Sequence, residues 1–548
     1  MTARPGKEKL IEQFAADGLN FMFGNPGTVE QGFLDAVDKA SGFEYILSLQ
    51  ETVAAGIADG YARATGGAAL LQLHSGVGLG NGIGMLYQSM RGHTPLVVVA
   101  GDAGVRYDAM DAQMASDLVA MARPVTKYAT RVTDPGSVLR TIRRAVKIAL
   151  TPPRGPVFVA LPMDVLDAPN TEPVVPTSVP RTDAAPSDAA IGQAAELLAG
   201  ARRPLILAGD GVSLAHAQAE LTAVAELLGA DVWDVDYSEV ITAASHPLHR
   251  GATGHMFGGH SKELVQDADG VLIVGTYVFP EVFPELGSPF AADAKIVHID
   301  LNAYEIAKNF PVDLGIVADP KAALRALLTA LDRRLAPESR AAAAGRLAAR
   351  RAERDRERAE FAAASHDGTA IEAFLHALAE QTGGDLIVFD EALTSSPLVT
   401  KYLPPNRPGD YHVTRGGSLG VGIPGAVGAK LAHPDRTVVG FTGDGGSMYT
   451  YQALWTAARH GIGAKFVVCN NHKYRLLDDN ISEYWKERDI APHSFPRSFD
   501  LSHPEIDFAG LARALGADGM RVEKPVQAAE AVRRMLDHQG PFLIDLQI

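Results

Sequence analysis

The chain has 548 residues, 47% of them hydrophobic and 21% charged, which is ordinary for a globular protein and long enough for about three domains. Its net charge of −15 argues against a nucleic-acid partner or an anionic membrane surface. The single cysteine, Cys469, excludes an intrachain disulfide. No apolar run approaches the ~20 residues of a membrane span, and the first residues lack the apolar core of a signal peptide, so we expect a cytoplasmic protein.

Short apolar strands alternate with segments of helical period along the whole chain. This pattern predicts an α/β fold of three doubly wound parallel-sheet domains. The first domain is expected over residues 1–170, with the strands FMFG, YILSL, AALLQLHS, LVVVAG and VFVALP. A stretch with five prolines, residues 169–190, then predicts a linker along the surface.

The second domain is expected over residues 190–332, with the strands PLILAG, ADVWDV, GVLIVGT, KIVHIDL and LGIVAD. It is followed by a segment rich in alanine, arginine and glutamate, APESRAAAAGRLAARRAERDRERAEFAAA. Because acidic residues alternate with the arginines, the segment is typical of an exposed helical connector and not of a nucleic-acid site. The third domain is expected over residues 366–548, with the strands DLIVFD, TVVGFTGD, KFVVCNN and FLIDLQ.

In the third domain an aspartate and an asparagine follow two successive strands. TVVGFTGD ends at Asp444, SMYTYQALWTAARHG has helical spacing, and AKFVVCNN ends at Asn471. The two strands of such a βαβ unit are parallel and usually adjacent, so Asp444 and Asn471 should meet at one sheet edge. Their oxygens suit Mg²⁺ or Ca²⁺, while Gly445, Gly446 and the helix start suit an anion. The unit predicts a metal-bridged diphosphate site; the alternative is a structural turn with a capping acid.

Gly420, Gly422 and Gly425 match G-x-G-x-x-G in LGVGIPGAVG, which offers a competing dinucleotide-binding interpretation. No clear strand leads into the pattern, and the expected ribose-binding acid is hard to place. We expect these glycines to permit close helix packing near a cofactor instead.

With these motifs the sequence resembles the thiamine-diphosphate-dependent enzymes over essentially its whole length. The likeness is to their 2-oxoacid decarboxylase and acetolactate synthase-like members, above all to the benzoylformate decarboxylase group. FGNPGTVEQGFL, ILSLQETVAAGIADGYA, LHSGVGLGNG and LWTAARHGI carry it. The resemblance implies pyrimidine-binding, middle and diphosphate-binding domains in that order.

The resemblance also implies roles for single residues around the cofactor. Asp444, Asn471 and the backbone carbonyl of Lys473 would bind Mg²⁺ or Ca²⁺. Leu419 would hold thiamine diphosphate in its bent shape, and Glu51 would bond the pyrimidine ring. Further cofactor contacts are implied for Gly445, Gly446 and Ser396.

On the substrate side, the resemblance implies that the Thr28 hydroxyl meets a substrate carboxylate and that His74 relays protons. Read by itself, a strand-end histidine followed by serine is more often structural. The pattern breaks in two places: Val282 stands where the family has a second histidine, and Arg475–Asp478 replaces a run of small residues. Tyr474, Leu476 and Leu477, with Val282, are expected to line the substrate pocket.

Three functions are therefore weighed. The first is non-oxidative decarboxylation of a 2-oxoacid to an aldehyde, and the second is a carboligase or lyase reaction on the same cofactor, favoured by the missing second histidine. The third is a non-catalytic binding or regulatory protein, against which the intact Glu51 and metal ligands argue. The family resemblance implies a homodimer or homotetramer with each cofactor between two chains. The sequence leaves open a second nucleotide in the middle domain.

Overall fold

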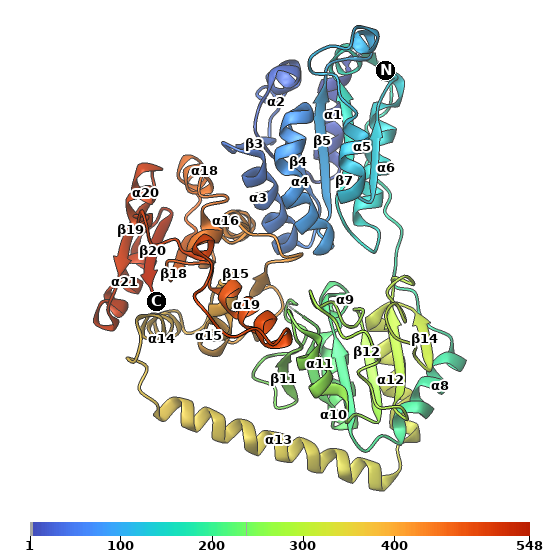
Figure 1. Ribbon diagram of the computed structural model, residues 1–548. Helices are drawn as coiled ribbons and strands as arrows, with labels where there is room; N and C mark the ends of the chain where they lie inside the picture. The colour runs from blue at the N-terminus through green and yellow to red at the C-terminus, as the bar shows by residue number, and fades with distance from the viewer. Residues whose placement is uncertain (1–3, 237) are drawn as a thin grey trace. The chain divides into compact units, whose positions relative to one another are not determined.

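A computed structural model describes residues 4–236 and 238–548, and it contains three six-stranded sheets flanked by helices (Figure 1). The described chain divides into two compact units. The first extends to Pro180 and includes Asp367–Tyr402 and Thr414–Ile548; the second comprises Arg181–His366 and Leu403–Val413. The predicted α/β class with three doubly wound parallel sheets is confirmed. None of the described helices is both long and apolar enough to cross a membrane.

The first sheet has the strand order β3-β2-β4-β5-β7-β6 and is parallel throughout. Its strands are β2 Phe21–Gly24, β3 Glu44–Leu47, β4 Ala69–Leu73, β5 Leu96–Asp102, β6 Tyr128–Arg131 and β7 Val157–Pro162. Its helices are α1 Gly6–Ala16, α2 Gln31–Val37, α3 Glu51–Thr65, α4 Ser75–Arg91, α5 Leu118–Ala122, α6 Val138–Leu150 and α7 Met163–Asp167. A separate antiparallel pair joins β1 Arg4–Pro5 to β8 Pro169–Asn170.

The second sheet, in the second unit, has the order β11-β10-β9-β12-β13-β14 and is also parallel. Its strands are β9 Pro204–Ala208, β10 Asp231–Asp234, β11 His249–Ala252, β12 Gly270–Val274, β13 Lys295–Asp300 and β14 Leu314–Val317. The helices are α8 Asp188–Ala199, α9 Asp210–Leu214, α10 Gln218–Leu228, α11 Gly258–Val265, α12 Pro320–Arg334 and α13 Pro337–Ala363. In α13, Ala343 is the one buried residue, which confirms the predicted exposed helix.

The third sheet has the order β16-β15-β17-β18-β20-β19. Its strands are β15 Ile387–Glu391, β16 Tyr411–Val413, β17 Val438–Gly443, β18 Lys465–Asn470, β19 Asp518–Val522 and β20 Phe542–Gln547. Its helices are α14 Ala370–Thr382, α15 Ser396–Tyr402, α16 Gly422–Ala432, α17 Asp444–Ser447, α18 Ala453–Arg459, α19 Arg475–Glu487, α20 Phe508–Ala514 and α21 Ala528–Asp537.

One predicted helix is wrong in detail. The run after Asp444 forms two short helices, α17 and α18, and not one continuous helix. Between them, the hydroxyls of Thr450 and Tyr451 donate to the backbone carbonyls of Gly420 and Phe508. These tertiary hydrogen bonds hold the connecting residues in turns, which the apolar spacing of the sequence did not reveal.

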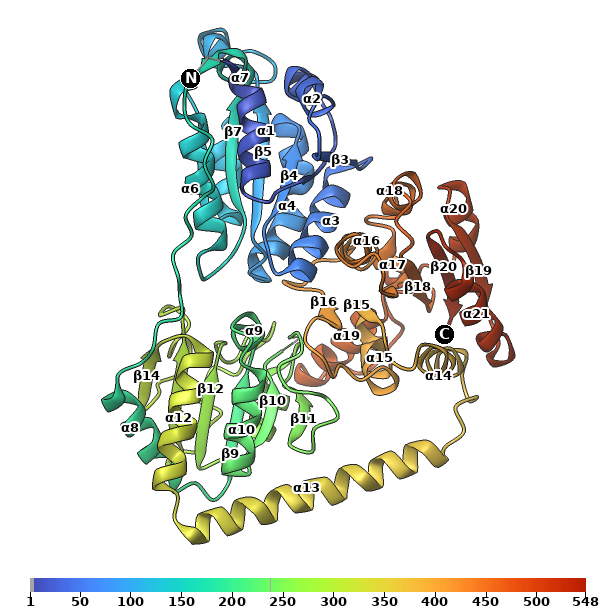
Figure 2. The same cartoon turned by 180° about the vertical axis from the view of Figure 1, so that it is seen from behind.

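Helices α3 and α16 of the first unit approach each other at backbone distance (Figures 1 and 2). A Cβ atom at Gly60 would collide with the backbone of Gly425, and one at Gly428 would collide with the carbonyl of Ile57. Only glycine permits this spacing. The glycine-rich stretch therefore takes part in close helix packing: the Gly425 backbone faces Gly60 of α3, and a Cβ atom at Gly425 itself would collide with the Phe389 ring of β15.

We expect Gly428→Ala to lower the urea midpoint of unfolding by the equivalent of about 1–3 kcal/mol, because the new methyl group has no room. Gly84→Ala is the matched control: Gly84 is also helical, but a Cβ there meets nothing within 4 Å. The urea midpoint of that variant should equal or exceed that of the parent, since alanine is more favourable than glycine in a helix by up to about 1 kcal/mol. Equal midpoints for both variants would contradict the packing argument.

Candidate active site

Three predicted residues follow the carboxyl ends of adjacent strands in the first sheet. Thr28 comes after β2, Glu51 after β3 and His74 after β4, and these strands are neighbours in the order β3-β2-β4. Ligands of open parallel sheets bind along this edge. Thr28 is exposed, Glu51 is buried and His74 is half-buried.

Glu51 is the first residue of α3 and is 5% exposed. Its Oε1 accepts a hydrogen bond from Asn25 Nδ2 at 3.3 Å, and its Oε2 accepts one from Asn81 Nδ2 at 3.0 Å. The helix is capped by Gln50, whose side chain accepts two backbone N–H groups of the first turn. Glu51 is thus a buried carboxylate with neutral partners and is not the helix cap.

Glu51 and His74 share a neighbour, Gly78 in α4. A Cβ atom at Gly78 would lie 2.8 Å from Glu51 Oε1 and 3.1 Å from His74 Cβ. Both side chains therefore lie over the same glycine, which leaves room for them at the first turn of the helix.

His74 is the residue before α4, and its imidazole contacts a residue that the sequence analysis missed. Nδ1 lies 2.8 Å from Oε2 of Glu30, which is 3% exposed. The other oxygen of Glu30 accepts the backbone N–H of Gly101 at 2.9 Å. Burial raises the pKa of Glu30, and the contact with His74 opposes that rise. The only signal in the sequence was an acid two residues after Thr28 in GNPGTVE.

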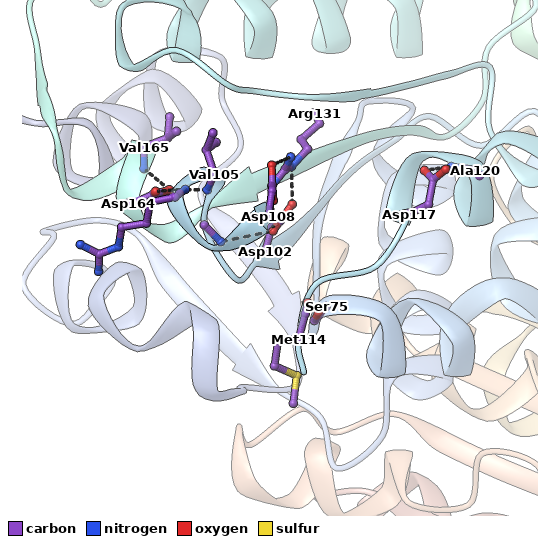
Figure 3. Close-up of polar contacts among 12 residues, drawn as sticks. Ser75, Asp102, Val105, Asp108, Met114, Asp117, Ala120, Arg131, Asp164 and Val165 are labelled. Carbon is purple, nitrogen blue, oxygen red and sulfur yellow. Dashed lines mark hydrogen bonds and ion pairs between the residues drawn. The ribbon is translucent and has the colours of Figure 1, made fainter. Parts of the chain in front are cut away.

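The loop after β5 is fixed beside this edge (Figure 3). Arg131 forms ion pairs with two carboxylates of this segment. Its Nε lies 2.6 Å from Oδ2 of Asp102, the last residue of β5, and its Nη1 lies 2.7 Å from Oδ2 of Asp108 in the loop. Ser75, the residue after His74, has a left-handed φ of 45° and donates its hydroxyl to the carbonyl of Met114 at 3.0 Å. The loop is therefore anchored next to the histidine.

In the third sheet, Asp444 and Asn471 meet as predicted. β17 and β18 are adjacent and parallel, with Gly443 opposite Cys469. Asp444 Oδ2 and Asn471 Oδ1 both accept the backbone N–H of Lys473, each at 3.1 Å, so the two oxygens converge on one point. The Lys473 carbonyl accepts the N–H of Arg475 at 3.0 Å.

Asp444 is 4% exposed, and its second oxygen accepts the N–H of Gly445 at 2.7 Å. Burial raises its pKa, and hydrogen bonds from the backbone N–H groups of Gly445 and Lys473 oppose that rise. The Tyr474 ring packs directly on Gly445, where a Cβ atom would collide with it. Ser396, another predicted cofactor contact, is buried and donates its hydroxyl to Asp390 at 2.9 Å.

A second carboxylate that the sequence analysis missed is Glu391, at the end of β15. Its oxygens accept the backbone N–H groups of Gly420 and Gly422, which flank Val421 just after Leu419. The hydroxyl of Thr442 adds a contact at 3.3 Å. Glu391 is 1% exposed, and burial raises its pKa to about 7. It therefore ties the Leu419 loop to β15 and β17.

The predicted pocket residues lie on surfaces. Leu476 is half-buried and Leu477 is 39% exposed, both in the first turn of α19. Val282 belongs to the second unit, is 53% exposed, and donates its N–H to the carbonyl of His255 at 3.1 Å.

The contacts thus form two groups in the first unit, one around Glu51 and His74 and one around Asp444 and Glu391. Over residues 4–236 and 238–548, no hydrogen bond or ion pair joins Glu51 to Asp444. In the same residues no three His, Cys, Asp or Glu side chains are placed to hold a metal ion.

Comparison with known proteins identifies the family. Three thiamine pyrophosphate enzyme models match in order: the N-terminal TPP binding domain at residues 4–121, the central domain at 191–327 and the C-terminal TPP binding domain at 394–546. The chain belongs to the thiamine pyrophosphate enzyme family. The two groups of polar residues described above lie in or directly beside the segments matched by its two TPP-binding domains.

Relatives within this family differ in activity. The chain is 29% identical to a benzoylformate decarboxylase of Pseudomonas aeruginosa over 533 residues, covering 96% of each protein. It is 27% identical to an acetolactate synthase large subunit of Lactococcus lactis over 550 residues, covering 99% of this chain and 92% of that protein.

Solved structures of the family share the whole fold. A thiamine diphosphate-dependent 4-hydroxybenzoylformate decarboxylase of Rhodococcus jostii RHA1 has a TM-score of 0.85, with 28% identity and 99% of each chain covered. A thiamin diphosphate-dependent enzyme of Mycobacterium smegmatis, described as putative, also has a TM-score of 0.85, with 27% identity and full coverage of both chains.

The residues present fit thiamine diphosphate. Oxygens of Asp444 and Asn471 converge on one point, and carboxylate and amide oxygens suit a hard divalent cation. In the other group, Glu51 is a buried carboxylate whose hydrogen-bond partners are neutral amides.

Glu391 should make stability depend on pH. The folded carboxyl keeps its proton up to about pH 7, whereas the unfolded one loses it near its ordinary value of 4.5, so the free energy of unfolding falls as pH rises through this window. Glu391→Gln is the matched variant, because the amide has nearly the same shape as the protonated carboxyl and does not titrate. Between about pH 5 and pH 8 the free energy of unfolding of the parent should fall by up to about 3 kcal/mol more than that of the variant. The measurement is the urea midpoint of each cofactor-free protein as a function of pH. The same pH dependence in both proteins would contradict the prediction.

Proposed function

We propose that the protein catalyses the thiamine-diphosphate- and Mg²⁺-dependent, non-oxidative decarboxylation of a 2-oxoacid to an aldehyde. The observation that carries the proposal is the joint presence, in one family member, of the converging Asp444 and Asn471 oxygens, the buried Glu51 and the half-buried His74. Named relatives that decarboxylate benzoylformates support the substrate class.

In this proposal residues 366–548 form the diphosphate-binding domain. Asp444, Asn471 and the carbonyl of Lys473 would hold Mg²⁺ or Ca²⁺, which would supply positive charge for the diphosphate. Gly445 and Gly446 let the backbone approach the phosphates, with Ser396 nearby, and Leu419 supports the cofactor from the loop tied by Glu391.

Residues 1–170 form the pyrimidine-binding domain, with residues 190–332 as the middle domain. When bound, thiamine diphosphate supplies the nucleophilic carbon and the electron sink for breaking the bond beside the keto group. Glu51 would hold a hydrogen bond to a ring nitrogen of the pyrimidine and so orient that ring. His74 gives and takes protons at the reacting carbon and oxygen, and the Thr28 hydroxyl orients the substrate carboxylate.

The proposal also assigns residues to the substrate side of the site. Within the diphosphate-binding domain we assign it to Tyr474, Leu476 and Leu477. The leucines of α19 take space beside Tyr474, which favours a 2-oxoacid other than unsubstituted benzoylformate.

A panel of aryl and aliphatic 2-oxoacids tests the proposal. The holoenzyme should release CO₂ and aldehyde from at least one of them. Glu51→Gln should keep its fold and cofactor affinity but lose about 10²–10⁴-fold in kcat, because the amide cannot supply the negative charge. Absence of CO₂ and aldehyde with every acid would refute the proposed activity.

A carboligase or lyase reaction on the same cofactor is the second candidate. It is favoured by Val282, which cannot carry a proton where the resemblance expects a second histidine, and by the similarity to acetolactate synthases. Mixing a 2-oxoacid with an aldehyde separates the two candidates: a 2-hydroxyketone indicates ligation, and aldehyde release alone indicates decarboxylation.

We expect cofactor binding to depend on a divalent metal through Asp444. Chelator-treated parent should bind thiamine diphosphate in calorimetry only after Mg²⁺ is added, and Asp444→Asn should lose this response. Asp545→Asn is the matched control, since Asp545 is buried in the same sheet and accepts hydrogen bonds from Asn470 and Gln547. Metal-independent binding by the parent would contradict the assignment, and no binding at all would favour a non-catalytic binding or regulatory protein.

We also propose that the working unit is a homodimer or homotetramer. Each cofactor would then be held by Glu51 of one chain and by the Asp444 group of another. This accords with the lack of a hydrogen bond or ion pair between Glu51 and Asp444 over the described residues.

A further inference from the structure

Glu30 and His74 form a pair whose two members follow neighbouring strands of the first sheet. Glu30 ends a single 3-10 turn, Thr28–Glu30, that follows β2, while His74 follows the neighbouring strand β4. Oε1 of Glu30 is fixed by the backbone N–H of Gly101, the sixth residue of β5. Oε2 is thereby directed at Nδ1 of His74, 2.8 Å away.

Two glycines make this approach possible. A Cβ atom at Gly27 would overlap the imidazole of His74, and one at Gly101 would overlap the carboxylate of Glu30. The ring is therefore packed against the Gly27 backbone, while the carboxylate is packed against β5. This packing leaves the pair little freedom to rotate.

The hydrogen bonds of the pair assign the two ring nitrogens different tasks. Nδ1 is committed to Glu30, and no hydrogen bond to Nε2 exists among the described residues. The side chain of His74 is 15% exposed, so the ring is reachable from the sheet edge. When a buried acceptor holds Nδ1–H, Nε2 is the nitrogen that takes up and releases a proton.

We propose that Glu30 is the positioning residue for His74: it fixes the ring through Nδ1 and makes Nε2 the proton-carrying atom that faces the substrate. This inference rests on the proposed function, in which His74 moves protons. Glu30 itself touches neither substrate nor cofactor in this arrangement, and it acts through the histidine.

Glu30→Gln keeps the shape of the side chain but removes the charge. In the holoenzyme we expect kcat to fall about 10–100-fold with KM changed less than about threefold, and the pH profile of kcat to change shape. Affinity for thiamine diphosphate should stay within about twofold, because the residues assigned to the cofactor are untouched.

A control variant and a double-mutant cycle with His74 separate a positioning role from simple destabilisation. Glu172→Gln alters another buried glutamate of the first unit, one that accepts the N–H groups of Leu139 and Arg140 and does not contact His74, so kcat and its pH profile should be unchanged. In a His74→Ala background, Glu30→Gln should have no further effect on kcat. An equal loss of kcat with and without His74 would overturn the proposal.

A second readout does not depend on turnover. In protein with ¹⁵N-labelled histidine, the ring signals assigned by His74→Asn should show Nδ1 protonated and Nε2 unprotonated in the neutral parent, and Glu30→Gln should change this pattern. Unchanged His74 signals would overturn the proposal even in an active enzyme. If the expected signals are found but no 2-oxoacid is consumed, the proposed function fails and the positioning by Glu30 stands.

Discussion

Both parts of the candidate site depend on carboxylates buried at the ends of parallel strands without a lysine or arginine partner among the described residues. Glu51, Glu391 and Asp444 are each at most 5% exposed, and they accept hydrogen bonds only from amides and a hydroxyl. Burying carboxyl groups costs free energy, which the surrounding sheet must offset, and at Glu391 and Asp444 this burial raises the pKa. The cost leaves unneutralised acceptors at fixed positions, ready for a metal ion, a ring nitrogen or a proton.

Close contacts at glycines hold these acceptors in place. Gly78 lies under Glu51 and His74, Gly445 lies under the Tyr474 ring, and Gly446 would place a Cβ atom 3.1 Å from Glu391. A side chain at any of them would displace a functional group. The same principle joins the two halves of the first unit, because Gly60, Gly425 and Gly428 bring α3 and α16 to backbone contact. Rigid packing around the carboxylates is what a preorganised site needs.

The residues proposed for the cofactor and those proposed for the substrate lie on different kinds of structure. The positions of Asp444 and Asn471 are fixed by strand register, with β17 beside β18. Leu477 and Val282, by contrast, are partly exposed residues of a helix start and a loop. Changes there leave the sheet intact, so members of one family can keep the cofactor and differ in reaction. The chain is 29% identical to a benzoylformate decarboxylase and 27% identical to an acetolactate synthase large subunit, so overall identity does not separate the two reactions.

The sequence by itself determined the α/β class, the central strands and the convergence of Asp444 with Asn471, because buried parallel strands are nearly all apolar and their ends share an edge. It missed β6, β11, β16 and β19, all at sheet edges: several residues of β6, β11 and β19 are polar and half-buried, and β16 is buried but only three residues long. It also missed Glu30 and Glu391, and it joined α17 to α18. Only the tertiary structure decided these, since the partners of Glu30 are 44 and 71 residues away in the chain and those of Glu391 are 29 to 51 away. Contacts at such separations leave no periodic signal along the sequence.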